Sequence, residues 1–426
     1  MSVIPAMSSD AKKRSGERTV FTVVAGLFAI WGLALWLYNT LFFKFSEFFA
    51  FEPVHVAWAL TLFHVAYFLL AMPAALFHRQ FGYKLGFLFG LCIFALGAFL
   101  LYLGIVQQSS FYFLGAIVMT GSCGALLDTS LNPLAVEAGD PCTSTRRLNI
   151  AHAFNGLGLI AAYYTAIWLI EEHHLSLGAT AQLSAQPYVM VGLGAIMLAF
   201  LTEQITLPAF ATKSTAKASG IREQLRPLFA DRTFMIAAAA LFAYCVVLTI
   251  LWTSSYNYRA AELPDHTVTF IERVALWFVL GRVAGTVLMR WIDPVRLLQW
   301  CTGLCLIAIL VTAVAGGPAG WVSLISCSLF LSIIYPTVSG SALIRHPAGM
   351  KLAAGLLVTA AGIGSALSSQ LVTLALHEWH LDARLVIASA LPFLAIILAY
   401  ARKAYSGEQR VPAQSAPPSG HPVLPA

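Results

Sequence analysis

One carboxylate, Asp128, lies deep inside an apolar stretch that runs over about residues 109–136. It stands nine residues before Glu137, which at 1.5 Å per helical residue places it about 13 Å from the nearer boundary. A charged carboxylate at such a depth is costly, so it needs a reason to be there. The position predicts a group that takes up and releases a proton. The alternative is a structural partner for Asn132 or Arg282.

A second group of polar residues opens the stretch at about 147–170. Successive helical residues turn by about 100°, so Asn149, His152, Asn155 and Gly156 share one stripe about 120° wide. Amides donate and accept hydrogen bonds at once, as the hydroxyls of a sugar require. The stripe therefore predicts that His152 and Asn155 line a wet cavity. Hydrogen bonding between helices is the alternative.

Aromatic residues occur at helical spacing in two other apolar stretches. Trp31, Tyr38 and Asn39 share one face of the first stretch, and Trp252 lies near the end of the seventh. Aromatic rings can stack on the C–H face of a sugar, so Tyr38 and Trp252 are candidate platforms, with Asn39 as a polar neighbour. Ordinary helix packing explains Trp31 at least as well.

A proline in the tenth apolar stretch follows Tyr335 and precedes Thr337. A proline inside a helix frees a carbonyl and bends the chain, and in lipid the freed group must find a partner nearby. The bend predicts either a gate beside a cavity or a static kink. Tyr335 is the candidate sugar-binding residue of this stretch.

The composition sets the environment in which these residues act. Of 426 residues, 59% are hydrophobic and 10% are charged, against roughly 25% charged in soluble domains. Lipid must therefore surround most of the chain, which excludes soluble enzymes and nucleic-acid binders. The sequence contains no His-Glu-x-x-His or Gly-x-Ser-x-Gly arrangement, so a membrane-embedded enzyme is not expected either. The seven cysteines include no Cys-x-x-Cys pair, and no metal site or disulfide is predicted; we expect them to be small core residues.

Twelve apolar stretches are long enough to cross a bilayer. They are continuous rather than alternating, and so predict an all-α membrane protein rather than a barrel. The expected spans are 19–43, 54–77, 85–106, 109–136, 147–170, 187–207, 233–256, 267–289, 295–316, 320–344, 351–376 and 383–402.

The basic residues predict how the chain is oriented. With the N-terminus inside, 20 of the 25 Lys and Arg residues fall on the inner side and 4 on the outer side, so both termini are expected in the cytoplasm. The longest connection, 208–232, separates six spans from six. We therefore expect six-helix bundles at 19–207 and 233–403, with disordered tails at 1–18 and 404–426. Two parallel six-span repeats are the plan of major facilitator transporters, which bind substrate between the halves.

Several motifs resemble those of the fucose–galactose–glucose:proton symporter family of that superfamily. Residues 128–133 (Asp-Thr-Ser-Leu-Asn-Pro) resemble its acid-Thr-Ala-Ala-Asn-Pro motif, and residues 147–155 resemble its Arg-Leu-Asn-x-Ala-Gln-x-Phe-Asn motif. Residues 67–74, Gly281 with Arg282, and 335–337 also match. The resemblance extends over about 20–402.

This resemblance implies proton-coupled monosaccharide uptake, with Asp128 where the family has its proton-coupling glutamate. Asn39, His152 and Leu248 depart from the family's usual acidic, glutamine and polar residues. We expect a sugar substrate, fucose or a related hexose or N-acetyl sugar, a proton as coupling ion and no cofactor. We also expect a functional monomer, in the inner membrane of a bacterium. The alternative is a facilitator or exporter of another small solute, without coupling through Asp128.

The binding groups predicted for the sugar come from both halves of the chain; they are Tyr38, Asn39, Asn132, His152, Asn155, Trp252 and Tyr335.

Overall fold

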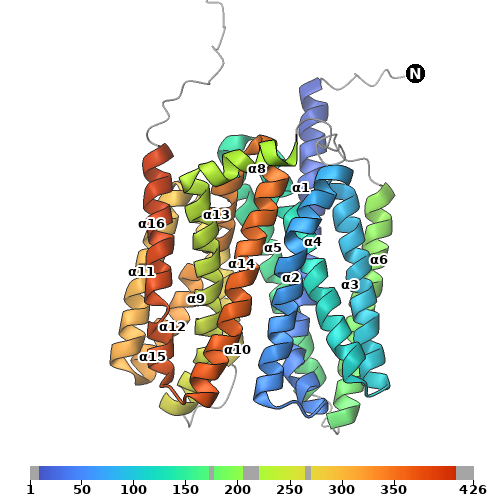
Figure 1. The fold of residues 1–426 in the computed structure, drawn as a ribbon, viewed down its shortest axis with the longest axis vertical. Helices are drawn as coiled ribbons and strands as arrows, with labels where there is room; N and C mark the ends of the chain where they lie inside the picture. The colour runs from blue at the N-terminus through green and yellow to red at the C-terminus, as the bar shows by residue number, and fades with distance from the viewer. Residues whose placement is uncertain (1–8, 172–176, 205–219, 264–269, 409–426) are drawn as a thin grey trace, which may run out of the picture.

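The computed structural model describes residues 9–171, 177–204, 220–263 and 270–408, except the side chains of some helical residues within these ranges. In these ranges the chain is an all-helical bundle of long helices that run alongside one another (Figure 1). α1 begins and α16 ends at the same end of the bundle, which we call the terminal end (Figure 1). Helices are expected because each one satisfies its own backbone polar groups, which lipid cannot do.

Each of the twelve expected spans falls on a helix. The first six correspond to α1 (Ser9–Phe48), α2 (Pro53–Phe81), α3 (Tyr83–Val106), α4 (Ser110–Glu137), α5 (Ser144–Glu171) and α6 (Leu177–Gln204). The next four correspond to α9 (Arg232–Glu262), α10 (Phe270–Leu288), α11 (Pro294–Ala315) and the pair α12 (Gly317–Leu331) with α13 (Ile334–Leu343). The last two correspond to α14 (Met350–Thr373) and the pair α15 (Ala383–Ala388) with α16 (Leu391–Glu408).

Nine helical segments in the described part of the chain are long and apolar enough to cross a membrane. The crossings by α5, α6 and α10 stay predictions. Three short elements complete the described structure: the turns η1 (Pro141–Thr143) and η2 (Pro347–Gly349), and η3 (Leu374–Glu378), a wider helical turn that continues α14.

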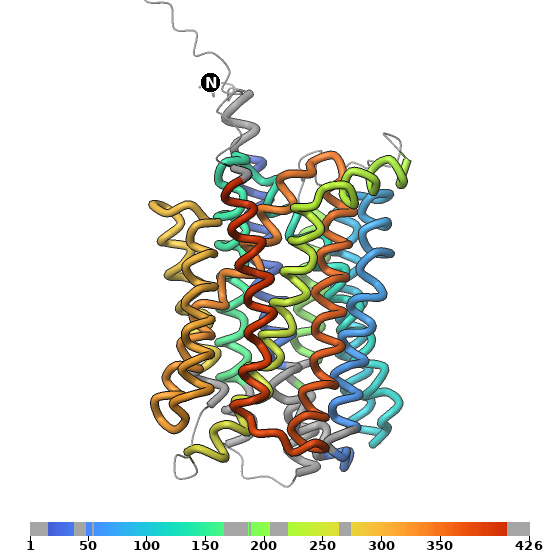
Figure 2. The backbone as a smooth tube through the Cα atoms, turned by 60° about the vertical axis from the view of Figure 1, so that its left-hand side comes forward, coloured from blue at the N-terminus to red at the C-terminus, as the bar shows by residue number. Residues whose placement is uncertain are grey.

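Three features differ from the expectations. α1 begins at Ser9 and α16 runs on to Glu408, so helix replaces part of each expected disordered tail. A further helix, α8 (Ile221–Ala230), lies in the expected central loop and crosses the terminal end of the bundle (Figures 1 and 2). α8 has 10 residues, which is too short to cross a bilayer, since a crossing needs about 20. The expectation that all seven cysteines are core residues is wrong for Cys92 and Cys142, which are exposed.

Glycines allow close helix crossings, one of which joins α1 to α5. A Cβ atom at Gly32 would collide with the backbone carbonyl of Asn155, and one at Gly158 would collide with the carbonyl of Ala29. Gly281 likewise lets α10 approach the backbone of α12 at Leu329. Helices without a hydrophobic drive between them associate through this kind of close packing.

The α1–α5 crossing gives a test of the packing. Gly32→Val should destabilise the protein by about 1–3 kcal/mol or more, because its side chain has no room beside Asn155. Gly26→Val is the matched control on the same helix, since a Cβ at Gly26 meets no heavy atom within 4 Å. Thermal unfolding in detergent should give a lower Tm for the first variant only. Equal Tm values would contradict the crossing.

Candidate substrate and proton site

Asp128 lies on α4 and is held by a neutral partner. The hydroxyl of Tyr67, on α2, donates a hydrogen bond of 2.6 Å to its Oδ2 atom. Both side chains are half-buried. Among the described residues Asp128 belongs to no ion pair. Neither structural alternative for Asp128 is therefore seen, because Asn132 and Arg282 bond elsewhere.

Small residues fix the ring of Tyr67 where three helices meet. A Cβ at Gly124 of α4 would lie 3.1 Å from the Tyr67 ring, and one at Gly362 of α14 would lie 2.8 Å from it. The ring thus fills the space that both glycines leave, and its hydroxyl points to Asp128. In the sequence Tyr67 opens the matching motif at residues 67–74. Its signal in the sequence is a tyrosine at mid-span, because a buried phenol usually needs a polar partner.

Asn132 and His152 form a hydrogen-bonded pair between α4 and α5. The Nε2 atom of His152 lies 2.9 Å from the amide oxygen of Asn132. Because that oxygen can only accept, Nε2 carries the proton in this arrangement. The imidazole ring lies between Phe28 and Tyr335, at 4.6 Å and 5.6 Å between ring centroids. His152 is only 7% exposed, so these contacts occupy most of its surface.

The polar stripe of α5 contains one asparagine that bonds to a neighbouring helix, Asn149, and one that is partly accessible, Asn155. Asn149 is fully buried and donates to the hydroxyl of Thr337 on α13 at 3.2 Å, which is the interhelical alternative. Asn155 is half-buried and donates to the carbonyl of Phe28 at 3.3 Å. Its amide oxygen accepts no hydrogen bond from the residues that the structure describes, so the predicted role of Asn155 in lining a cavity stays a prediction.

Arg282 joins three helices through backbone carbonyls. Its Nε atom donates to Ser332 at 3.0 Å and one terminal nitrogen donates to His152 at 3.1 Å. Pro336, four residues after Ser332, has no N–H to bond that carbonyl. The helix is accordingly interrupted between α12 and α13, and Arg282 donates the hydrogen bond to the Ser332 carbonyl that Pro336 cannot make. The helix is thus interrupted at the position where the sequence predicts a bend, and whether that position acts as a gate stays a prediction.

Tyr335 and Trp252 each place a polar group in the interior of the bundle. The hydroxyl of Tyr335 and the indole nitrogen of Trp252 are buried and meet no hydrogen-bond partner among the described residues. Both side chains are half-buried, and the Trp252 ring lies 4.7 Å from Trp36 and 5.6 Å from Phe278. Trp36 was not singled out from the sequence, since it lies beside the predicted face. The side chains of Tyr38 and Asn39 lie outside the described residues.

The described residues thus place Asp128, Asn132, His152, Asn155 and Tyr335 on helices that contact one another. They include no group of three His, Cys, Asp or Glu side chains that could hold a metal ion.

Comparison with known proteins decides the family. A model described as Major Facilitator Superfamily matches residues 19–369. The chain belongs to the major facilitator superfamily. It is accordingly a member of a transporter superfamily and not an enzyme.

Similar proteins include sugar transporters, in agreement with the family that the motifs resemble. The L-fucose-proton symporter of Escherichia coli K12 is 27% identical over 78% of this chain and 81% of its own length. The glucose/galactose transporter of Brucella abortus is 26% identical over 89% of this chain and 91% of its own. A crystal structure of the transporter FucP in the outward conformation matches with a TM-score of 0.82 and 24% identity, over 91% of this chain and 99% of that one.

The two carbonyl contacts of Arg282 can be tested without changing its charge. Arg282→Lys should destabilise the protein by about 1–3 kcal/mol, because an ammonium group cannot reproduce the planar fork and leaves a buried carbonyl unpaired. Arg290→Lys, at an exposed position after the same helix, should have little effect. Thermal unfolding in detergent measures both. An unchanged Tm for Arg282→Lys would show that the two hydrogen bonds of the guanidinium group do not stabilise the protein.

Proposed function

We propose that this protein carries out proton-coupled monosaccharide uptake by alternating access. The observation that carries the proposal is a carboxylate deep in the bundle whose hydrogen-bond partner is a neutral tyrosine. An acid paired with Arg or Lys would stay charged in every state. Within the described part of the chain Asp128 is hydrogen-bonded to Tyr67 and to no cation, so proton uptake removes a charge that no ion pair compensates.

The sugar is proposed to bind beside this acid, between the halves of the chain. Asn132, His152 and Asn155 provide hydrogen-bonding groups from α4 and α5, and Tyr335 adds a hydroxyl from α13. Trp252 provides a ring for stacking and a free indole N–H. Asn39 and Tyr38, on α1, complete the proposed set. The names of the relatives favour fucose, glucose or galactose, and support sugar over a hydrophobic solute.

We infer that two contacts between α5 and α13 close the terminal side of the proposed site. Asn149 bonds Thr337, and a Cβ at Gly340 would lie 3.0 Å from the Cα atom of Thr145. These contacts join α5 to α13 nearer to the terminal end than Asp128, His152 and Tyr335. We take the terminal end as cytoplasmic, from the excess of basic residues there. The described state then corresponds to a carrier closed toward the cytoplasm.

The proposed cycle follows from these positions. Asp128 takes a proton from the outer side, and sugar binds the amide and aromatic groups beside it. The neutral, loaded carrier then separates α5 from α13, and Asp128 releases its proton to the cytoplasm. Only a difference in binding between the two states can drive this shift. The proposal includes a functional monomer in a bacterial inner membrane, with halves at 19–207 and 233–403.

Substitution of the acid tests the coupling. Asp128→Asn keeps a polar group of the same size that cannot titrate, so it should abolish proton-driven accumulation of sugar while preserving sugar counterflow. Both are measured in proteoliposomes with labelled sugars, with and without a pH gradient. Glu203→Gln, at an exposed position near the end of α6, should leave accumulation intact.

Two results would overturn the coupling role of Asp128. One is undiminished proton-driven accumulation by Asp128→Asn. The other is counterflow by the wild-type protein that no pH gradient can convert into accumulation, which would favour the uncoupled facilitator.

The proposed closure between α5 and α13 has its own test. Gly340→Leu should shift the equilibrium away from the closed terminal side by about ten- to a hundredfold, because the leucine overlaps Thr145. Proton-driven uptake should fall accordingly. Gly303→Leu is the control, since a Cβ at Gly303 meets nothing within 4 Å. Normal uptake by Gly340→Leu would show that this contact does not belong to the cycle.

A further inference from the structure

α8 is an amphipathic helix with an apolar row that is exposed at both ends and half-buried at Leu225. Gln224 and Leu228 are buried against the bundle, whereas Ile221 and Phe229 are 43% and 56% exposed. At about 100° per residue, Ile221, Leu225 and Phe229 cover about 80° of the helix surface beside the buried face. Large hydrophobic side chains that are exposed together on one helix mark a site of interaction with a membrane or another molecule.

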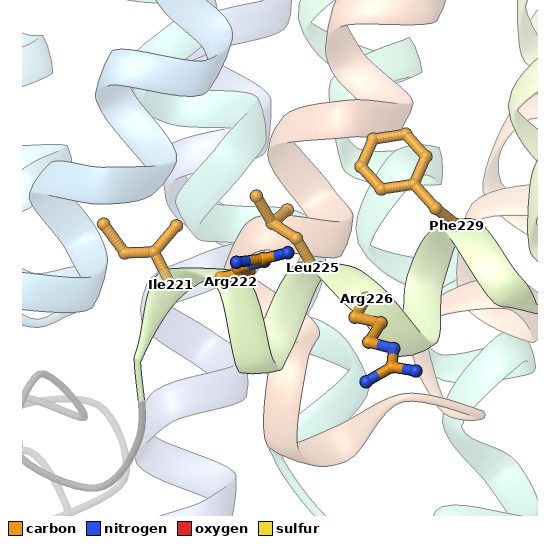
Figure 3. A pocket seen from close by; sticks show the side chains of 5 residues that line it. All are labelled: Ile221, Arg222, Leu225, Arg226 and Phe229. Atoms are coloured by element: carbon orange, nitrogen blue, oxygen red, sulfur yellow. The ribbon is translucent and has the colours of Figure 1, made fainter.

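Two arginines border this apolar row on its outer side. Arg222 and Arg226 are exposed and follow Phe229 around the helix, at about 100° and 140° from Ile221. Figure 3 shows Ile221, Leu225 and Phe229 projecting from one edge of α8 and Arg226 from the opposite edge. The five side chains line a hollow of about 600 Å³ (Figure 3).

α8 cannot lie far from the membrane surface. It ends at Ala230, and α9, which is long and apolar enough to cross the membrane, begins at Arg232. Arg79, near the end of α2, donates to the side chain of Gln224 at 3.2 Å. A Cβ at Gly349, just before α14, would lie 3.4 Å from the Gln224 carbonyl. The helix is thus fixed level with the ends of three neighbouring helices.

The nearby acids do not neutralise the two arginines. Neither Arg222 nor Arg226 belongs to an ion pair in the part of the chain that the structure describes. The carboxylate of Glu223 accepts from the backbone N–H of Gly220 at 3.0 Å. Asp231 caps α9 through Thr233 and also contacts Arg345 and His346. The two guanidinium groups are left to attract an external anion.

We propose that this face of α8 binds an anionic phospholipid of the leaflet at the terminal end. The phosphate of the headgroup bonds Arg222 and Arg226, whose guanidinium groups suit phosphate oxygens. An acyl chain of the same molecule covers Ile221, Leu225 and Phe229. An apolar row beside basic residues, at membrane level, is the pattern of an interfacial helix that binds acidic lipid. A protein partner would not require the row to lie at the membrane surface.

The test uses the full-length protein in detergent, titrated with phosphatidylglycerol and, separately, with phosphatidylcholine, and native mass spectrometry counts the bound lipids. The Arg222→Gln/Arg226→Gln double variant should bind phosphatidylglycerol about 30-fold more weakly. Each arginine is expected to contribute about 1 kcal/mol of binding free energy, and about 1.4 kcal/mol corresponds to a tenfold change in affinity. Binding of phosphatidylcholine should not change. Arg402→Gln/Lys403→Gln removes two exposed charges from α16 at the same end and should keep wild-type binding.

A second readout locates the lipid and separates it from a free anion. Hydrogen exchange of residues 220–231 in the wild type should slow in nanodiscs containing phosphatidylglycerol relative to phosphatidylcholine, and the double variant should lose the difference. Glycerol 3-phosphate at millimolar concentration should not displace the lipid, because it lacks the acyl chain that covers Phe229. Equal loss of binding in both double variants, unchanged binding in the first, or full displacement by glycerol 3-phosphate would each overturn the proposal. A Tm of the double variant in detergent equal to that of the wild type confirms that it is folded.

Discussion

The bond between Arg282 and the Ser332 carbonyl is the interaction on which the inner arrangement of the protein depends. Pro336 cannot donate to that carbonyl, and within a bundle surrounded by lipid the unpaired group must be satisfied locally. Arg282 does so from α10 and bonds His152 of α5 with the same side chain. One buried cation therefore ties together the broken pair α12–α13, α10 and α5. It is buried at 4% exposure, with the ring of Phe278 4.6 Å from its guanidinium carbon.

The placement of this cation also explains why Asp128 can be free of one. Arg282 directs its donors at carbonyls, so the charges of the two residues do not form a permanent pair. Asp128 instead contacts the hydroxyl of Tyr67, whose ring is fixed by glycines on α4 and α14. A proton can enter or leave such a pair without breaking an ion pair. The separation of the two charges is thus a structural condition for the proposed coupling.

The fold and the family could be predicted from the sequence almost completely. Twelve apolar stretches, the basic residues between them and the motifs at 128–133 and 147–155 predict an all-helical major facilitator protein, and the family match and helix positions agree. This works because lipid imposes one backbone solution and one length on each crossing. α8 was missed because a short amphipathic helix at a membrane surface has neither that length nor that continuous hydrophobicity.

The candidate site shows what the sequence determined and what it left open. The sequence determined that Asp128 lies deep in an apolar helix and that the polar residues of α5 share one stripe, since depth and periodicity follow from helix geometry alone. Only the tertiary structure decided the partners: Tyr67 for Asp128, Thr337 for Asn149 and two carbonyls for Arg282. These partners are 61, 188 and 50 or 130 residues away. Which groups meet depends on how helices cross, and that is set by the glycines and side-chain volumes of several helices together.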